Sequence, residues 1–176
     1  MPIHISLKKA LDMFSLLLVP ALVCICHVDI ITCHYELTNV AHSKPVTLSS
    51  LYDNDSRYVG SKVVNGLFSD LTATAAERSP WLRIDLGARF EINEIEVFAR
   101  ADCCGTQLHD VDFKVGENIH DMYRCGHYTG PTVKGQRIAV FCPHNTIGRY
   151  VQIQITKGHK NELTPAEVLV WGVKVN

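Results

Sequence analysis

The stretch Phe90-Glu-Ile-Asn-Glu-Ile-Glu-Val-Phe98 decides the fold class. Polar side chains separate the apolar residues Phe90, Ile92, Ile95 and Val97, and a spacing near period two is typical of a β-strand with one face in a core. Similar alternation recurs in Arg83–Leu86, Val111–Val115, Tyr150–Ile155 and Glu167–Val175. Short strands of this kind, without any segment of long helical period, predict an all-β domain built as a β-sandwich or jelly roll.

Two stretches between these strands lack the alternation, and they cover residues 43–66 and 118–135. In a sandwich such stretches are expected to be loops at the ends, where binding residues usually lie. Gly87 separates the first two strand runs and is expected to form a turn between them.

Length and charge narrow the function classes. The chain has 176 residues, which corresponds to one domain. Its 17 Lys and Arg residues nearly balance its 18 Asp and Glu residues, giving a formal net charge of -1. Without a basic surface, nucleic acid and anionic membranes are not expected as partners. The absence of low-complexity tracts also argues against a fibrous or disordered protein.

The N-terminus has the pattern of a secretory signal peptide. A basic start precedes an apolar run over residues 13–26, which is shorter than the ~20 residues that a membrane span needs. We therefore expect residues 1–26 to be a signal peptide, with an end as late as Cys33, and residues 34–176 to form one secreted domain. An uncleaved signal anchor is the alternative.

Four cysteines remain in the expected mature domain: Cys103, Cys104, Cys125 and Cys142. An even set in an exported chain suggests disulfides. The adjacent Cys103 and Cys104 could close on each other in a small strained ring, which would form a rigid apolar platform. Alternatively they face opposite sides of a strand as thiols, or each bonds to one of the other two cysteines. The residues alone leave all three arrangements open.

Six motifs occur in a fixed order along the chain. They are Asn39-Val-Ala41, Val63-Val-Asn-Gly66, Ser79-Pro-Trp-Leu-Arg-Ile-Asp-Leu86, Arg100-Ala-Asp-Cys-Cys104, Gly148-Arg-Tyr-Val151 and Leu163-Thr-Pro-Ala-Glu-Val168. Taken together, over residues 38–176, they resemble the F-type lectins, the fucolectin family related to eel agglutinin. The resemblance implies a β-sandwich jelly roll, which agrees with the strand pattern.

The resemblance also implies a sugar-binding site. Arg100 and Asp102 match the family's Arg-x-Asp motif, in which the arginine donates hydrogen bonds to sugar hydroxyls. By the same resemblance, Cys103 and Cys104 would form a vicinal disulfide that packs against the sugar ring. Charged donors then orient the ligand, while the apolar platform supplies contact area.

The implied sugar-binding motif is degenerate at two positions. Ala73 stands where the family has a histidine, and Gln107 stands where it has an arginine or lysine. Each lost hydrogen bond from a charged donor costs about 1.5–3 kcal/mol, so fucose specificity is expected to be altered. For Arg100 the alternative is a purely structural ion pair with Asp102.

A structural Ca²⁺ ion beside the sugar site is a further implication of the resemblance. Ca²⁺ takes about six to eight oxygen ligands, many of them backbone carbonyls. The expected contributors are the carbonyls of Lys62, Leu67 and Ala166, the side chains of Asn65 and Asp70, and the carboxylate of Glu167. The alternative is an ordinary turn with a solvated Asp70. The resemblance also pairs Cys125 with Cys142.

These observations predict a secreted, non-catalytic protein that recognises glycans, fucosylated ones among them, with a role in innate defence as one expectation. No catalytic motif is present to suggest an enzyme. The alternative function is a structural or cell-adhesion module that has lost sugar binding and contacts protein or lipid through its end loops. In either case a homo-oligomer is a further expected partner arrangement.

Overall fold

A computed structural model describes residues 36–175 of the chain. The signal peptide expected over residues 1–26, and Cys33, lie outside the described residues. The described strands are β1 (Thr38–Asn39), β2 (Val46–Leu48), β3 (Trp81–Ala99), β4 (Val111–Asn118), β5 (Asp121–Tyr128), β6 (Arg137–Phe141), β7 (Ile147–Ile155) and β8 (Pro165–Lys174). The described helices are the short 3₁₀ segments η1 (Tyr52–Asn54), η2 (Ser56–Tyr58), η3 (Gly60–Val64) and η4 (Gly105–Gln107). The expectation of an all-β fold is therefore confirmed.

Strand β3 is longer than the sequence pattern predicts, because it runs through Gly87 instead of turning there. Gly87 adopts φ +80°, a conformation that costs glycine little, and its N–H donates to the Asp85 side chain at 2.8 Å. The pairing register shifts between Asp85 and Phe90, so the strand bends at this irregularity. The prediction of a turn at Gly87 is wrong, since the glycine bends one strand rather than ending it.

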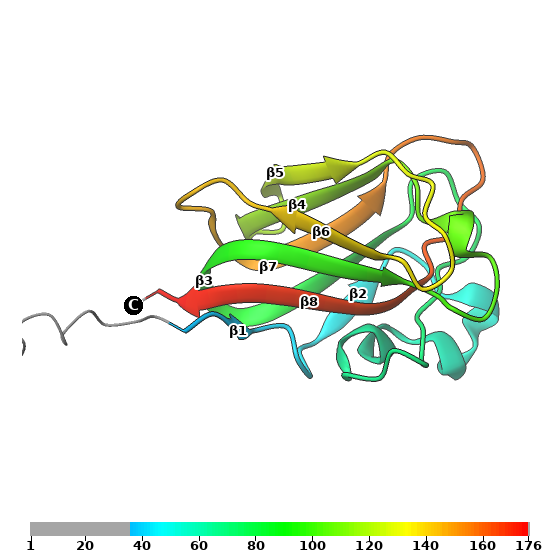
Figure 1. Ribbon diagram of the computed structural model, residues 1–176, viewed down its shortest axis with the longest axis horizontal. Coiled ribbons are helices and arrows are strands. Elements are labelled where there is room, and N and C mark those ends of the chain that lie inside the picture. The colour runs from blue at the N-terminus through cyan, green and yellow to red at the C-terminus, as the bar shows by residue number, and fades with distance from the viewer. Residues whose placement is uncertain (1–35, 176) are drawn as a thin grey trace, which may run out of the picture. The chain divides into compact units, whose positions relative to one another are not determined.

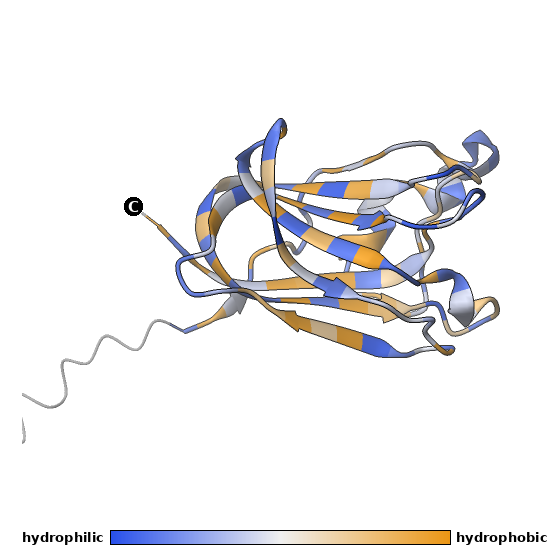
Figure 2. Ribbon diagram, turned by 90° about the horizontal axis from the view of Figure 1, so that it is seen from above, coloured by the Kyte–Doolittle hydropathy of each residue, from blue (hydrophilic) through white to orange (hydrophobic). Residues whose placement is uncertain are grey.

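The bend lets β3 take part in two layers of an antiparallel sandwich. Its first part pairs with β2 and β7, and β4 and β5 extend this layer. Its second part lies between β8 and β6, and β1 pairs with β8. Because β3 belongs to both layers, hydrogen bonds join all eight strands into one network. Figures 1 and 2 show the strands of the two layers running along the same long axis.

The core lies between the layers and is filled by alternate residues of the predicted strands. Figure 2 shows apolar and polar residues alternating along the strands. Burying each large aliphatic or aromatic side chain contributes about 1.5–3 kcal/mol. Fully buried residues include Leu82, Ile84, Ile95, Val97, Val111, Phe113, Val115, Val151, Ile153, Ile155, Val168 and Val170.

Strand β5 lies inside residues 118–135, which the sequence pattern predicts to be a loop. Among its residues only Cys125 is buried, so no alternation marks it in the sequence. Cys125 forms a disulfide with Cys142, with their Cα atoms 4.8 Å apart, which confirms this predicted pair. The bond ties the edge of one layer to the chain just after β6, which is an edge strand of the other layer.

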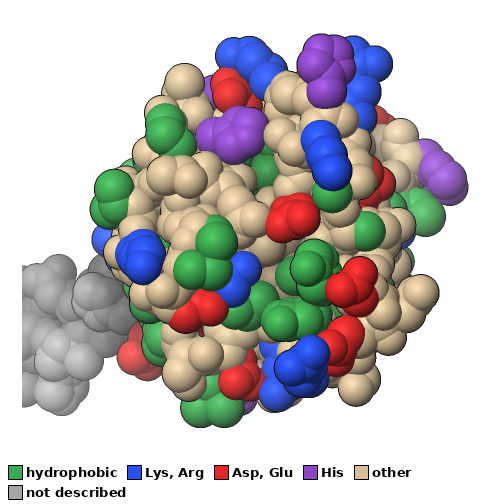
Figure 3. Space-filling model, turned by 90° about the vertical axis from the view of Figure 1, so that its right-hand side faces the viewer, with side chains coloured by type: hydrophobic (Ala, Val, Ile, Leu, Met, Phe, Trp, Pro, Cys, Tyr) green, Lys and Arg blue, Asp and Glu red, His purple; other side chains and the backbone are tan. Residues whose placement is uncertain are grey.

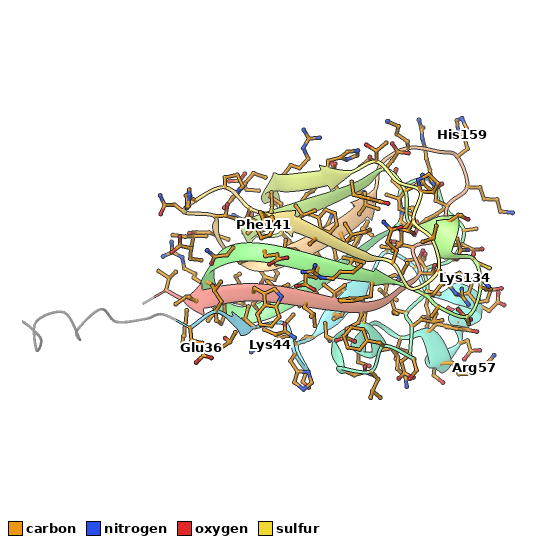
Figure 4. All side chains as sticks on the ribbon, in the orientation of Figure 1. Glu36, Lys44, Arg57, Lys134, Phe141 and His159 are labelled. Atoms are coloured by element: carbon orange, nitrogen blue, oxygen red, sulfur yellow. A yellow bond between two sulfur atoms is a disulfide. The ribbon has the colours of Figure 1, made fainter. Side chains whose placement is uncertain are left out.

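The two ends of the sandwich differ. All four 3₁₀ helices and the longer connections gather at one end, here called the loop end, while the C-terminus lies at the other (Figure 1). Arg57 and Lys134 mark the loop end in Figure 4, far from Glu36. The expected loop over residues 43–66 contains only the short strand β2 besides 3₁₀ turns. Within residues 36–175 no helix has the length and apolar character that crossing a membrane requires.

Candidate functional site

A pocket of about 240 Å³ at the loop end brings together five of the six residues expected to bind sugar. Figure 3 shows this face, where apolar side chains lie among acidic and basic ones. We call it the central pocket, and it is lined by Tyr52, Tyr58, Ala73, Arg100, Cys103, Cys104, Gln107, Glu162 and Thr164. Asp102 does not line the central pocket, but its carboxylate accepts hydrogen bonds from Arg100.

Arg100 enters the pocket directly from the end of β3. Its Nε and Nη2 donate to the two carboxylate oxygens of Asp102, both at 2.7 Å. The arginine side chain is 16% exposed and that of Asp102 is 59% exposed. The two hydrogen bonds hold the pKa of Asp102 well below its usual range and raise that of Arg100. The ion pair fixes the orientation of the guanidinium, while Asp102 remains exposed to solvent. Arg100 therefore forms an ion pair and also lines the pocket.

Cys103 and Cys104 line the pocket, and neither forms a disulfide within the described part of the chain. The structure therefore differs from the expected vicinal disulfide. Cys104 caps η4 in the left-handed conformation, with φ +52°, and its side chain is exposed. A hydrogen bond between the two thiols, together with burial, raises the pKa of Cys103. Both sulfurs remain beside Arg100, where the resemblance places them.

Gln107 is held on both sides by residues of the segment before β8. Its Nε2 donates to Glu162 Oε2 at 2.7 Å, and its Oε1 accepts from the Thr164 hydroxyl at 2.8 Å. Both ends of the amide are therefore occupied. These two bonds fix the orientation of Gln107 in the pocket wall and use one of its two Nε2–H donors.

Ala73 is a nearly buried residue of the pocket lining, in a segment held by backbone hydrogen bonds. The Tyr52 N–H donates to the Ala73 carbonyl at 3.1 Å, and the Ala73 N–H donates to the Tyr58 carbonyl at 3.2 Å. These bonds bring the two tyrosine rings together edge to face, with centroids 5.4 Å apart and planes at 83°. The small side chain of Ala73 adds little bulk to the pocket that these rings and Gln107 also line.

The connection over residues 129–136 supports the site from behind. Gly135 N–H donates to the Arg100 carbonyl at 3.1 Å, and Lys134 Nζ donates to the Asp102 carbonyl at 3.0 Å. The buried Thr132 hydroxyl donates to the Gly105 carbonyl. A Cβ at Gly105 would collide with the backbone of Lys134, so η4 packs closely on this connection. The position of Gln107 thus depends on residues distant in sequence.

The residues expected to bind calcium also lie together, next to the central pocket. Asp70 Oδ2 accepts hydrogen bonds from Lys62 Nζ and Asn65 Nδ2, both at 2.9 Å. These bonds lower the pKa of Asp70. Asn65 Oδ1 accepts from the Leu67 N–H at 2.8 Å, closing the turn. Asp70 is therefore held by side chains of this turn, whereas the alternative expectation placed it in solvent.

Glu167 lies beneath this turn, fully buried, and follows the buried Ala166. Its Oε1 accepts from the Gly66 N–H at 3.1 Å, while its buried Oε2 has no hydrogen-bond partner among residues 36–175. Burial raises the pKa of Glu167 to about 7, and the nearby charge of Asp70 adds to this. An orphaned buried carboxylate oxygen is costly, and a bound cation would satisfy it.

Two features of this turn fit a calcium ion, namely the buried Oε2 of Glu167 and the oxygen ligands around it. Oxygen ligands from Asn65, Asp70 and Glu167, with nearby carbonyls, are the kind that Ca²⁺ prefers. Among residues 36–175 no group of three His, Cys, Asp or Glu side chains could hold a metal. A site here would therefore depend on backbone carbonyls, as the resemblance implies.

A family model described as a NedA-like, galactose-binding domain matches residues 62–153, just over half of the chain. This chain belongs to that family. Fucolectin of Anguilla anguilla is 25% identical over 115 residues, which are 63% of this chain and 72% of the eel protein. Fucolectin-6 of Anguilla japonica is 30% identical over 98 residues, which are 55% of this chain and 52% of that protein. The expected membership of the F-type lectin family is confirmed.

Solved structures agree with this assignment. A fucolectin from striped bass (Morone saxatilis) serum matches with a TM-score of 0.73 and 26% identity, over 80% of this chain and 50% of that chain. A Streptococcus pneumoniae fucose-binding module, at 21% identity and TM-score 0.67, shares the fold over 77% of this chain and 95% of the module. The chain spans about half the length of Fucolectin-6 and of the striped bass lectin.

The protein is thus a fucolectin-like carbohydrate-binding module. Its relatives are lectins, which confirms the expectation of a binding protein rather than an enzyme. Sequence reasoning missed four pocket residues, namely Tyr52, Tyr58, Glu162 and Thr164. The tyrosines lie in a stretch without strand pattern, and the other two precede β8. Only the presence of two tyrosines in an expected end loop could have pointed to them.

Proposed function

We propose that the protein binds the terminal residue of a glycan in the central pocket, outside the cell and without catalysis. The observation that supports this most is the convergence of Ala73, Arg100, Cys103, Cys104 and Gln107 on one pocket. Arg100 would donate to ligand hydroxyls, since its Nη1 has no hydrogen-bond partner within residues 36–175. The tyrosine rings would offer apolar area to a sugar face.

An extracellular location is supported by two observations. The Cys125–Cys142 disulfide is typical of proteins from oxidising compartments. The striped bass relative is described as a serum protein. A role in innate defence would follow if the glycan proves to be a microbial one.

Specificity is proposed to differ from simple fucose binding. By the resemblance, Ala73 and Gln107 replace two polar sugar contacts. The amide of Gln107 is also oriented by Glu162 and Thr164, which leaves one Nε2–H for a ligand in place of a charged group. Arg100 is then the one cationic donor among the residues that line the pocket.

Calcium is proposed to bind the turn beside the pocket. Asn65, Asp70 and Glu167 would hold it, with carbonyls of Lys62, Leu67 and Ala166. The bound ion would coordinate the Glu167 oxygen that has no hydrogen-bond partner. It would also replace the Lys62 ammonium as the partner of the Asp70 carboxylate. Since Asp70 also lines a depression that reaches Arg100, ordering this turn would steady one side of the sugar site.

A glycan array with the domain over residues 34–176 tests the proposed function. Wild-type protein is expected to bind a defined subset of glycans, with weaker signal in EDTA than in calcium. Binding to no glycan would overturn the proposal and favour the adhesion module, which predicts the same Arg100–Asp102 ion pair. Strong binding to α-fucosides would contradict the proposed change in specificity.

Restoring the two replaced contacts is expected to create fucose binding. In Ala73→His with Gln107→Arg, the imidazole would enter the space beside the tyrosines. The guanidinium would pair with Glu162 and face the pocket. Two new charged donors should tighten fucose binding about tenfold or more, measured by calorimetric titration with methyl α-fucoside.

The single Gln107→Arg variant is the matched control, and it should gain less. Folding of each variant is checked by its thermal melting curve. A folded double variant that ignores fucose would show that the correspondence of these two positions to the family motif is wrong.

A further inference from the structure

One carboxylate, that of Glu162, belongs to the lining of the central pocket. Glu162 is partly buried, and its Oε2 accepts a hydrogen bond from the neutral Gln107 amide. Within residues 36–175, Glu162 forms no ion pair, although eleven pairs occur elsewhere in that range. A partly buried carboxylate without a cationic partner favours a ligand that brings positive charge or strong donors.

The other charges around the pocket do not offset this one. Arg100 is neutralised by its two hydrogen bonds to Asp102. A neighbouring pocket of about 350 Å³ shares Gln107 and Glu162 with the central pocket, and Lys160 lines this neighbouring pocket but not the central one. Lys160 has no carboxylate within 4.0 Å in the described part of the chain. Counted together, Arg100, its partner Asp102 and Glu162 leave one negative charge at the central pocket.

Aromatic rings in the lining of the same pocket suit the same kind of ligand. Tyr52 and Tyr58 pack edge to face in the pocket lining. The guanidinium of Arg57 lies over the Tyr58 ring, 5.5 Å from its centroid, so this ring already accepts a cation on one face. Ring faces attract cations through their quadrupole, by about 0.5–1 kcal/mol at exposed sites.

We propose that the central pocket selects hexosamines with a free, protonated amine, with Glu162 accepting hydrogen bonds from the ammonium group. This inference rests on the proposed function, because it names the sugar class that the same pocket would take. The ammonium would lie between the Glu162 carboxylate and the tyrosine rings. Arg100 Nη1 would donate to a ring hydroxyl on the other side of the sugar. An N-acetylated sugar would lose the charge and retain only one weaker donor.

Nuclear magnetic resonance titrations with matched monosaccharides test this. The probes are the methyl glycosides of glucosamine and galactosamine, their N-acetyl forms, and those of glucose and galactose. Wild-type protein is expected to bind the free amines about tenfold or more tighter than the other two classes. Raising the salt concentration should narrow this difference.

Three variants sharpen the result. Glu162→Gln keeps the shape and should bring amines and N-acetyl sugars to similar affinity. Glu117→Gln, at an exposed glutamate paired with Arg89, should change nothing. Lys160→Ala should strengthen amine binding, because a competing cation is removed.

The outcomes separate this inference from the proposed function. Equal binding of amines and neutral sugars by wild-type protein would overturn the inference and leave the proposed function standing. An amine preference that survives Glu162→Gln would overturn the role of Glu162. Absence of binding to these monosaccharides would overturn the inference, and absence of binding to every glycan on the array as well would overturn both.

Discussion

Replacing Arg100 by methionine is expected to weaken glycan binding roughly 10- to 150-fold, because a charged donor contributes about 1.5–3 kcal/mol. Methionine keeps the length and the apolar part of the side chain, so the pocket wall should persist. The partner Asp102 is 59% exposed and can remain charged in water once its arginine is gone. The loss should therefore appear in affinity, measured with the glycan that binds best on the array, and hardly in thermal stability.

Arg89→Met is the matched control for this prediction. Arg89 also pairs with one carboxylate, that of Glu117, but both side chains are exposed and lie away from the pocket. Its removal should leave affinity unchanged. If Arg100→Met binds as well as wild-type protein, the ion pair with Asp102 is structural only, and the pocket binds through other groups.

A second large effect is expected in the pH dependence of stability without calcium. Burial raises the pKa of Glu167 from near 4.5 to about 7. Such a group favours the folded state when protonated, so its contribution is present below pH ~4.5 and is lost as the pH rises to ~7 and above. The difference corresponds to about 3 kcal/mol in the free energy of unfolding. Urea unfolding in EDTA at pH 5 and pH 8 measures it.

Variants isolate the titration of Glu167 from that of the histidines. Glu167→Gln should remove most of the loss between pH 5 and pH 8, and it should be more stable than wild-type protein at pH 8. Glu96→Gln is the control, because hydrogen bonds from Arg137 lower the pKa of that buried carboxylate instead. Glu96 stays charged across this range, so its replacement should leave the slope unchanged.

Calcium should change the same dependence of the free energy of unfolding on pH. Since Ca²⁺ binds the charged form of Glu167, saturating calcium should stabilise wild-type protein most at pH 8, by mass action on the folded state. Glu167→Gln should respond little. A wild-type protein whose stability ignores both calcium and pH would contradict the calcium site as well as the raised pKa of Glu167.

The sequence predicts the central strands well, because each of them buries one face between the two layers and leaves the other face partly exposed. In β4 and β7, buried and partly exposed residues alternate, as in Val111, Phe113 and Val115. Strand β5 escapes this reasoning because it is an edge strand with one buried residue. Gly87 misleads for another reason, since a positive φ serves a bend within a strand as readily as a turn between strands.

The site is less predictable because it is assembled from segments far apart in the chain. The Arg100–Asp102 pair is visible in the sequence, since two residues suffice to form it. The roles of Gln107 and Glu162 are not, because their hydrogen bond joins positions 55 residues apart. Likewise, backbone hydrogen bonds of Ala73 with Tyr52 and Tyr58 hold the two tyrosines at the pocket, and these residues are up to 21 positions apart.

The placement of the C-terminus has a practical consequence for measuring weak ligands. Val175 lies at the end of the sandwich away from the loop end, and its N–H is held by the carbonyl of Arg89 (Figure 1). A biotin tag attached there would anchor the protein to a sensor chip so that the central pocket of each molecule faces the flowing solution. Dense arrays prepared in this way would convert millimolar single contacts into measurable avidity on multivalent glycans.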